Sequence, residues 1–413
     1  MLRTSLDGLV VVDFTQIAAG PTCSQILADL GARVIKVEAP EGELGRGLGP
    51  GWIGDDAALF HAFNRNKLGL ALDLKTLEGV SAARRLIAGA DIMLESMRPG
   101  VMKRLGLDHE VLLSENPRLI YCAISAYGQE GPYAAKAGVD GIIQADSGLM
   151  SIIGTAESGP VKVQAPVVDV FTGYVAAMGI LARLNQRNRD GCGGFLDVSL
   201  LNSALVLQQS SITNYLVDGV LPERIGSAAP YSAPNEAFPT TDGWIMVAAY
   251  NGGRWERLCD QLGCPELTTD PRFASSSSRV AHRDEMQTLL NARFRQDTTD
   301  AWLEKLGAAD ILCARVSTYA DLRDHPQVSA NGMIAEIDHP ALGTIRTPGF
   351  PINSREFKDH RHRPAPGLGE HSGEILASIG YSPQEIAELF EKRAVIGNLY
   401  DGYRDQPARA ARR

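Results

Sequence analysis

A strand–helix–strand pattern near the start of the chain restricts the fold more than any other feature of the sequence. Residues 9–14 form a short apolar run that predicts a buried strand. Pro21 predicts the first turn of a helix that ends at Gly31, because proline suits a helix start and glycine suits a helix end. Residues 32–38 predict a second strand. A strand, a helix and a strand within about 30 residues predict a βαβ unit, and therefore a parallel sheet covered by helices.

The same alternation continues along the next 160 or so residues and predicts the rest of a Rossmann-like α/β domain. Residues 39–60 are rich in glycine and proline, which favours a surface loop. Further helices are expected at 77–88 and 200–217, the second with a weak amphipathic pattern typical of a buried or interface helix. The further strands are expected at residues 68–74, 91–95, 119–125 and 195–199.

The sequence changes character after a proline-containing segment, residues 218–235, which is typical of a linker. Beyond it, Asp242-Gly243 between two apolar runs predicts a β-hairpin. Helical patterns follow at residues 253–263, 280–295 and 299–307. We therefore expect a large α/β domain over residues 1–225, a smaller α+β domain over residues 226–325, and a C-terminal segment, residues 326–413, that returns to the large domain. That segment includes a predicted helix at 383–392 and a basic, disordered tail at 404–413.

Composition excludes several classes of protein. The net charge of −9 and the pI near 5.5 argue against a nucleic-acid-binding protein. No apolar run approaches the roughly 20 residues of a membrane helix, and the first residues lack the pattern of a signal peptide. The six cysteines are scattered without the spacing of metal ligands, so we expect reduced thiols, a cytoplasmic protein and no metal.

Four cations follow the predicted strand ends, at Lys75, Arg98, Arg104 and Lys136. Because the carboxyl ends of parallel strands meet at one edge of a sheet, these side chains are expected there together, where open α/β sheets bind ligands. Lysine and arginine at such an edge predict a phosphate-binding site. The alternative is that each is a solvated surface charge, since both residue types are mostly exposed.

Asp169 is the most informative polar residue in the chain. It lies among apolar residues, directly before a helical pattern in which Val175, Met178 and Leu184 are among those available for one face. A carboxylate in such surroundings must be hydrogen-bonded, paired or functional. Either Asp169 is the N-cap of that helix, accepting an N–H from Phe171 or Thr172, or it is a nucleophile or a general base.

Short motifs along nearly the whole chain carry a resemblance to a known family. The motifs are Val11-Val12-Asp13-Phe14, Ala19-Gly20-Pro21, Leu30-Gly31-Ala32, Val34-Ile35-Lys36-Val37-Glu38, residues 64–73, Arg98-Pro99-Gly100-Val101, Arg104-Leu105-Gly106, Gly128-Gln129, Gly131-Pro132-Tyr133 and Leu368-Gly369-Glu370-His371-Ser372. Together, their order and spacing resemble those of the class III CoA-transferases, the family that includes formyl-CoA transferase and crotonobetainyl-CoA:carnitine CoA-transferase.

The resemblance implies that Asp169 is the catalytic nucleophile. In this family the matching carboxylate attacks the donor acyl-CoA and forms first a mixed anhydride and then an aspartyl-CoA thioester, from which an acceptor acid receives CoA. Such a site must exclude water and offer N–H donors to the oxyanions. The resemblance further implies coenzyme A as a substrate, no permanently bound cofactor, and a homodimer whose two chains interlock like linked rings.

The resemblance also implies a set of CoA contacts. Two positions depart from the family pattern: Ser96-Met97 stands where many relatives have Asn-Phe, and Ala39 stands where arginine is common. Stacking near CoA and one phosphate or adenine contact are therefore expected to differ. The implied contacts are Ala18, Ala19, Leu72, Asp73, Lys75, Ser96, Met97, Arg98, Arg104, Lys136, Ala137 and Asp140.

Two other functions and the choice of acceptor stay open at this point. An α-methylacyl-CoA racemase shares the fold, but its catalytic histidine would fall at Val139, which exchanges no protons. A non-catalytic acyl-CoA-binding protein would need the cleft without Asp169. No glycine-rich loop is visible between residues 231 and 244, which disfavours oxalate as acceptor. A small carboxylic acid such as a dicarboxylate is expected instead, with succinyl-CoA or a similar donor, and with Arg46 and Arg254 as candidate carboxylate partners unless they are surface charges.

Overall fold

The computed structural model describes residues 2–352 and 361–398, and the predicted tail at 404–413 lies outside them. The chain divides into two compact units, called here the large unit (residues 1–147, 163–214 and 327–413) and the small unit (residues 148–162 and 215–326). Residues 148–162, expected in the large domain, belong to the small unit, where Gly154 O accepts a hydrogen bond from Gly226 N at 2.8 Å.

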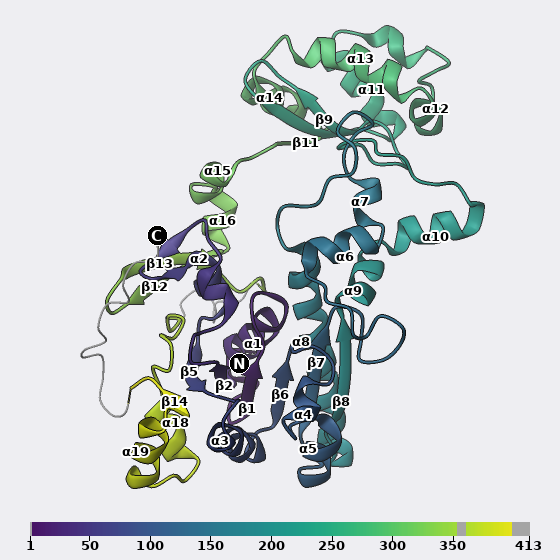
Figure 1. The fold of residues 1–413 in the computed structure, drawn as a ribbon. Helices are drawn as coiled ribbons and strands as arrows, with labels where there is room; N and C mark the ends of the chain where they lie inside the picture. Colours follow the sequence, from purple (N-terminus) through teal and green to yellow (C-terminus); the bar gives the residue numbers. More distant parts are fainter. Residues whose placement is uncertain (1, 353–360, 399–413) are drawn as a thin grey trace. The chain divides into compact units, whose positions relative to one another are not determined.

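The large unit contains a seven-stranded sheet within the described residues (Figure 1). Every neighbouring pair is parallel except the edge pair of β14 with β5. The mixed α/β fold with a mainly parallel sheet is therefore confirmed. In spatial order the strands are β14 (Val395–Ile396), β5 (Lys67–Leu72), β2 (Arg33–Glu38), β1 (Val10–Phe14), β6 (Ile92–Glu95), β7 (Ile120–Ser125) and β8 (Gly194–Ser199).

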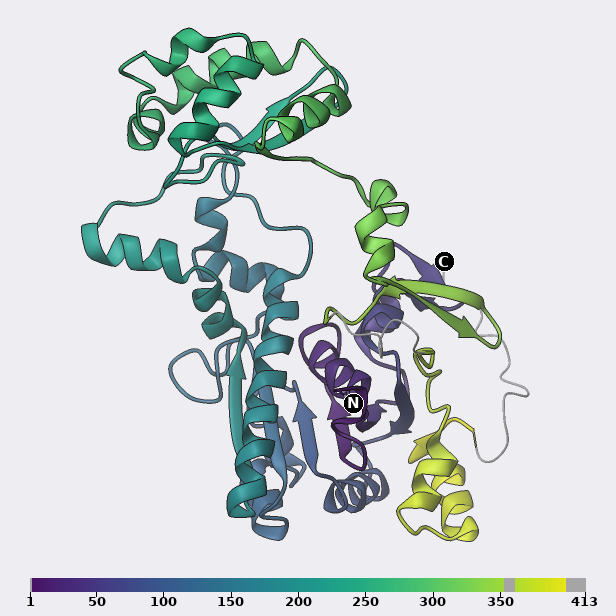
Figure 2. The ribbon, with the colours of Figure 1, turned by 180° about the vertical axis from the view of Figure 1, so that it is seen from behind.

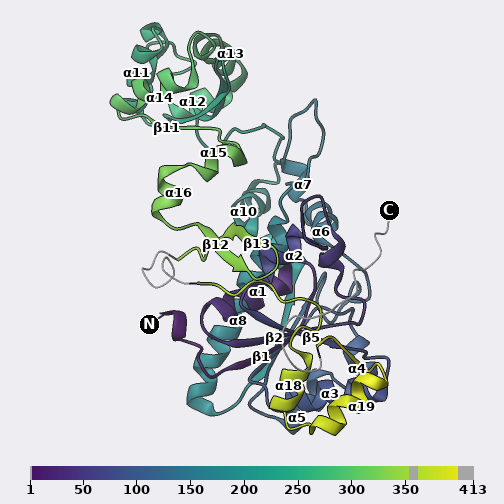
Figure 3. The ribbon, with the colours of Figure 1, turned by 90° about the vertical axis from the view of Figure 1, so that its left-hand side faces the viewer.

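Helices cover both faces of this sheet (Figures 1 and 3). On one face α1 (Ala19–Asp29) packs against α8 (Val167–Asp190), and Figure 2 shows these two helices side by side. On the other face α3 (Leu77–Ala88), α5 (His109–Glu115), α18 (Ser372–Ser378) and α19 (Pro383–Glu391) share a core with the strands. Both α1 and α8 connect parallel strands, so they run against the strand direction and begin at the carboxyl edge of the sheet.

Helix α8 meets the length and composition of a membrane span, which the sequence analysis did not foresee. Its charged residues are Asp169 in the first turn and Arg183, Arg187, Arg189 and Asp190 in the C-terminal third. The buried face includes the small residues Gly173, Ala176 and Ala177, which allow close packing, whereas Met178, expected on the buried face, is exposed. This pattern is typical of a helix that is buried on one side by its own chain.

The glycine-rich segment at residues 39–60 is ordered rather than a plain surface loop. It contains η2 (Leu44–Gly47), the paired strands β3 (Trp52–Ile53) and β4 (Asp56–Ala57), and the start of α2 (Ala58–Phe63). Arg46 and Phe60 are buried in it, and the Arg46 guanidinium lies 3.7 Å from the centre of the Phe60 ring.

The large unit contains several further helices and a hairpin. The predicted helix at 200–217 is two helices, because regular structure breaks at Gln208. These elements are α4 (Val101–Arg104), α6 (Asp140–Asp146), α9 (Leu200–Leu207), α10 (Gln209–Asp218, which continues into the small unit), α16 (Pro326–Ala330), and the hairpin of β12 (Ile334–His339) and β13 (Gly343–Pro348).

The small unit contains the hairpin predicted at Asp242-Gly243, extended by a third strand. The three antiparallel strands are β9 (Asn235–Pro239), β10 (Trp244–Ala248) and β11 (Leu312–Arg315). Its helices are α7 (Leu149–Ile152), α11 (Gly252–Gln261), α12 (Ser276–Ala281), α13 (Arg283–Phe294), α14 (Thr299–Ala308) and α15 (Tyr319–Arg323). An apolar core between these strands and helices makes it a separate α+β unit.

Candidate active site

Asp169 lies in the first turn of α8, two residues after the helix begins at Val167. The N-cap interpretation of Asp169 is therefore wrong, because the helix already starts before it. The cap comes from a distant residue: the Asp140 carboxylate, in the first turn of α6, accepts N–H bonds from Val168 at 2.9 Å and from Asp169 at 3.2 Å. Asp140 is buried, so it fixes the start of α8 and brings a second negative charge close to Asp169.

The Asp169 carboxyl group is half-buried, and no donor within the described residues reaches its oxygens. Desolvation raises its pKa to about 7, with a further contribution from the negative charge of Asp140. A carboxylate without donors in a poorly hydrated place is more basic and less stabilised than one in water. Asp169 therefore has the properties that a nucleophilic carboxylate requires.

The first turn of α1 comes next to this carboxylate because two glycines allow close contacts. A Cβ at Gly173, one turn after Asp169, would lie 2.6 Å from Ala19 O, so α8 touches the start of α1 there. A Cβ at Gly20 would lie 2.2 Å from the Thr15 side chain, so the loop before α1 also folds tightly onto the helix. The N-terminal turns of α1 and α8 therefore meet at the carboxyl edge of the sheet.

The loop between β1 and α1 uses side chains to bind its first N–H groups and leaves the next ones free. Thr15 N donates to Asp13 Oδ1 at 2.8 Å, and Gln16 N donates to Ser96 Oγ at 3.3 Å. Among the described residues no acceptor is found for the N–H groups of Ala18, Ala19 and Gly20. Free N–H groups at a helix start bind anions.

Three of the four predicted cations follow the C-terminal ends of strands β5 and β6. Lys75 follows β5, whereas Arg98 and Arg104 follow β6, and all three side chains are exposed at the carboxyl edge of the sheet. Lys136 is already engaged: its ammonium pairs with Asp146 at 3.2 Å and lies over the rings of Tyr127 and Tyr133.

The other predicted CoA contacts divide into exposed and buried groups. Ala18 and Ala19 are buried at the start of α1, and Leu72 is buried at the end of β5. Asp73 is half-buried and accepts the Lys75 N–H at 2.9 Å, and Ala137 is exposed before α6. Met97 packs against the sheet core, so the position that carries phenylalanine in many relatives presents no aromatic ring here.

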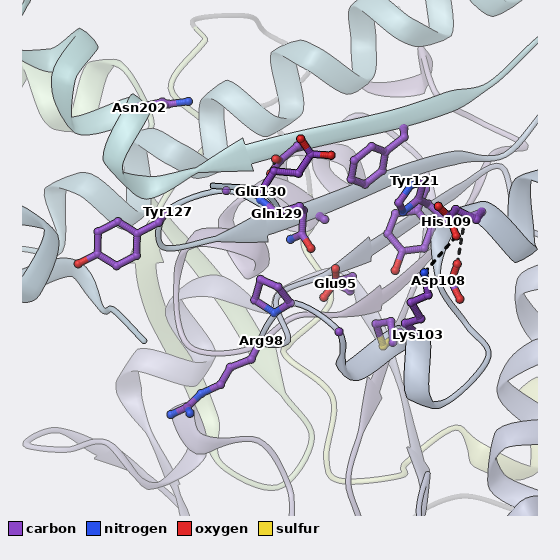
Figure 4. Close-up of a pocket in the computed structure, with 18 residues that line it drawn as sticks. Glu95, Arg98, Lys103, Asp108, His109, Tyr121, Tyr127, Gln129, Glu130 and Asn202 are labelled. Atoms are coloured by element: carbon purple, nitrogen blue, oxygen red, sulfur yellow. Dashed lines mark hydrogen bonds and ion pairs between the residues drawn. The ribbon is translucent and has the colours of Figure 1, made fainter. Parts of the chain in front are cut away.

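A pocket of about 580 Å³ opens beside Arg98, over the strands β6, β7 and β8 (Figure 4). Sequence reasoning missed it, because its walls come from strands and helices far apart in the chain. Buried Glu95 lies in it, and desolvation raises the pKa of this carboxyl group to about 7. The sequence signal that could have indicated this pocket was Glu95, an acidic residue at the end of an apolar strand. The lining includes Glu95, Arg98, Lys103, Asp108, His109, Tyr121, Tyr127, Gln129, Phe195 and Asp197.

The two arginines suggested as partners of the acceptor acid are occupied. Arg46 is buried and donates to Glu38 at 2.7 Å, to Asp56 at 2.6 Å and to Pro366 O at 3.0 Å. Arg254 Nε donates to the backbone carbonyl of Asp310 at 3.0 Å. Because Arg46 is buried and its guanidinium already binds Glu38, Asp56 and the Pro366 carbonyl, it has a structural role, and the prediction for it is wrong.

Comparisons with known proteins find similar chains over nearly the whole length of this one. Residues 6–372 match the profile of CoA-transferase family III. The chain is 34% identical to human succinyl-CoA:glutarate CoA-transferase over 94% of this chain and 90% of that protein. It is 36% identical to succinate–glutarate CoA-transferase of Agrobacterium fabrum, over 91% of this chain and 96% of that protein. A crystal structure of a CAIB/BAIF family protein from Brucella suis superimposes with a TM-score of 0.82 at 38% identity, covering 91% of this chain and all of that chain.

Proposed function

The chain belongs to CoA-transferase family III and is a class III CoA-transferase, and from that premise we propose that Asp169 carries the CoA transfer through covalent intermediates. The donor in this proposal is an acyl-CoA such as succinyl-CoA, and the acceptor is a small carboxylic acid. The observation that carries the proposal is the state of Asp169: a half-buried carboxylate with a raised pKa and no donor, in the first turn of α8.

The reaction begins when an Asp169 oxygen attacks the thioester carbonyl of the donor. The C–S bond breaks, the thiolate of CoA leaves, and a mixed anhydride of Asp169 and the acyl group remains. The thiolate then attacks the aspartyl carbonyl and expels the donor acid as a carboxylate, which gives the aspartyl-CoA thioester. No proton has to move in either step, so the site needs no general base.

The second half repeats these steps with the acceptor. Its carboxylate attacks the aspartyl thioester and releases CoA thiolate, and the thiolate attacks the acceptor carbonyl of the new anhydride. The acceptor leaves as its CoA ester and the Asp169 carboxylate is restored. Water would hydrolyse either anhydride, so the half-buried position of Asp169 among apolar neighbours supports this route.

The free N–H groups of Ala18, Ala19 and Gly20 support the proposal as oxyanion donors. They lie at the start of α1, which touches α8 one turn after Asp169. Donors fixed in advance stabilise charge that develops on a carbonyl oxygen. Exposed Lys75, Arg98 and Arg104 follow strand ends at the same edge and suit the phosphates of CoA. The other predicted contacts, including Lys136, Ala137 and Asp140, remain part of this proposal.

The acceptor in this proposal is a dicarboxylic acid. Two similar proteins are named for the transfer of CoA between succinate and glutarate, and acids of this size offer a second carboxylate for recognition. Arg46 is not the group proposed to bind it, because its buried guanidinium already binds Glu38 and Asp56. Val139 is an exposed residue before α6 and cannot take the part of a racemase histidine.

We include in the proposal a homodimer that forms over α8, in the cytoplasm. Tyr174, Met178 and Leu181 are 41%, 64% and 36% exposed, and their spacing places them on one side of the helix. A row of large apolar side chains on a surface marks an interface. Light scattering after chromatography tests this: wild type is expected to be a dimer and Met178→Glu a weakened one, and a monomeric wild type would contradict it.

A donor and acceptor screen tests the function. Succinyl-CoA and acetyl-CoA are offered with succinate, glutarate, oxalate and monocarboxylic acids, and CoA esters are measured by chromatography. Succinyl-CoA with glutarate is expected to be among the best pairs. Asp169→Ala is expected to lower turnover by roughly 10⁴-fold or more while acyl-CoA binding stays measurable. Retained turnover in that variant would remove Asp169 from its role.

A further inference from the structure

Ile17, in the loop before α1, has a backbone conformation that its side chain disfavours. Its φ is +70°, in the left-handed region, where branched side chains are rare. Such a conformation persists only when neighbouring groups enforce it, and it occurs most often where function demands a particular backbone course. Ile17 directly precedes Ala18 and Ala19, whose N–H groups are free at the start of α1. The conformation of Ile17 therefore sets the direction of those donors.

Glu43 is the group that enforces this conformation. Its Oε2 accepts the Ile17 N–H at 2.7 Å, although the two residues are 26 positions apart. The Glu43 side chain is 4% exposed, and its other oxygen lies 3.4 Å from the ammonium of Lys36. The same ammonium donates to Thr15 O at 3.0 Å. Glu43 and Lys36 therefore bind both ends of the strained segment.

Glu43 is itself fixed by its own segment. Its carboxylate accepts the Gly45 N–H at 3.0 Å, and its backbone N–H donates to Glu38 Oε2 at 3.1 Å. Glu38 is held in turn by Arg46. This chain of contacts explains why Arg46 is buried in a glycine-rich loop: it anchors the acceptor for Ile17. The contacts run from the segment after β2 to the loop before α1, and all of them are inside the large unit.

We propose that Glu43 is a positioning residue for CoA transfer, which holds Ile17 in the left-handed conformation so that the Ala18 and Ala19 N–H groups face the reacting carbonyl. This inference rests on the proposed function of Asp169. The Glu43 carboxylate bonds to Ile17 and Gly45 and not to Asp169, so in this proposal it acts through Ile17, and its loss misdirects the donors without removing them. The effect falls on the chemical steps and therefore on kcat more than on the KM for acyl-CoA.

Variants of Glu43 distinguish an effect on the catalytic donors from a loss of folding. Glu43→Ala removes the acceptor and is expected to lower kcat roughly 10- to 100-fold, as misplaced catalytic groups do, with a smaller change in KM. Glu43→Gln keeps an amide oxygen for the Ile17 N–H and should retain most of kcat. Glu43→Met, which keeps the length of the side chain, replaces Glu43→Ala if alanine leaves the chain unfolded. Glu336→Ala, in an exposed pair with Arg346, is the matched control and should behave as wild type.

The decisive variant adds Ile17→Gly to the Glu43 substitution. Glycine adopts positive φ without a Cβ penalty, so the loop no longer needs Glu43 to hold it. The double variant is expected to recover kcat by about tenfold relative to Glu43→Ala alone. A purely structural role would lower the melting temperature of Glu43→Ala, and the added flexibility of glycine would restore no kcat.

Two results overturn the inference: a kcat for Glu43→Ala within about twofold of wild type, or a loss that Ile17→Gly does not relieve. Both leave the proposed function intact, because wild type still transfers CoA through Asp169. Failure of the proposed function is a different result, in which wild type transfers no CoA or Asp169→Ala remains active. The two failures are thus distinguished by the wild-type and Asp169→Ala assays.

Discussion

Two aspartates beside helix α1 have opposite surroundings. Asp13, in β1, is fully buried and completely bonded: it accepts from Thr15 and Ser24 and pairs with Lys67 at 3.2 Å. Burial alone would raise its pKa, but Lys67, Lys36 and the two hydroxyl groups lower it to about 2. Asp169 is more exposed, yet nothing donates to it and its pKa is raised to about 7.

The comparison shows that the partners of a carboxylate, and not its burial alone, decide whether its charged form is stabilised. Two lysines neutralise the negative charge of Asp13, and hydrogen bonds occupy both of its oxygens. Asp13 therefore stabilises the C-terminal end of β1 and has no lone pair left to attack a substrate. Asp169 has a neighbouring negative charge in place of a cation. Its charged form is therefore destabilised in the folded protein, which in the proposed mechanism favours attack on a carbonyl carbon.

Asp13→Asn should have the largest effect on folding. The substitution leaves the fully buried Lys67 ammonium without its counter-ion, and removal of one partner of a buried pair costs about 3–5 kcal/mol. Chemical denaturation at pH 7 measures the change. Asp324→Asn, in an exposed pair with Arg323, is the control and should unfold like wild type. Equal stability of Asp13→Asn and wild type would break the distinction between the two aspartates.

Asp140→Asn should shift the pH dependence of kcat/KM, because Asp140 contributes to the raised pKa of Asp169. The attack requires the carboxylate form, so kcat/KM is expected to fall as the pH drops below about 7, the pKa of Asp169. Asparagine still accepts the Val168 and Asp169 N–H bonds but removes the negative charge that raises this pKa. The acid limb should therefore move to lower pH, whereas Asp140→Glu should leave it in place. An unmoved or raised limb in Asp140→Asn would exclude the charge of Asp140 as a cause.

Asp169→Asn removes the proposed nucleophile and should also change stability, by a smaller amount than Asp13→Asn does. Because the folded-state pKa of Asp169 lies above its unfolded value, the folded protein binds the extra proton between about pH 4 and pH 7, and stability falls as pH rises through that window. The variant lacks this loss and is expected to melt higher at pH 8 by on the order of 2–4 °C. The difference should vanish below pH 4. A lower melting temperature at pH 8 would mean that the Asp169 charge is stabilised in the fold.

Local sequence patterns predicted the elements whose formation depends on interactions within a few residues. The apolar run of β1 and the helix α3 appear where expected, because burial and capping act within a few residues. Asp169 stood out for the same reason, as a carboxylate among apolar neighbours. Its family resemblance supplied the chemistry, which no spacing of residues near it would have given.

Contacts between distant segments could not be predicted. Asp13, Lys36 and Lys67 come from three strands, and their meeting depends on a strand register that pairs Asp13 with Lys36. Asp140 caps a helix 27 residues further along the chain, and no local pattern predicts a cap supplied from so far away. Glu43 lies in a segment expected to be a surface loop, yet it binds Ile17. Nothing in the sequence around these residues indicated which of them would contact one another.

The aspartyl thioester itself is the most direct test of the central claim. Wild-type enzyme is incubated with succinyl-CoA and hydroxylamine, which converts an aspartyl-CoA thioester to a hydroxamate, and the digested protein is examined by mass spectrometry. The account predicts inactivation with the hydroxamate on residue 169, and none in samples without succinyl-CoA. An enzyme that transfers CoA while the peptide containing Asp169 stays unmodified would contradict it.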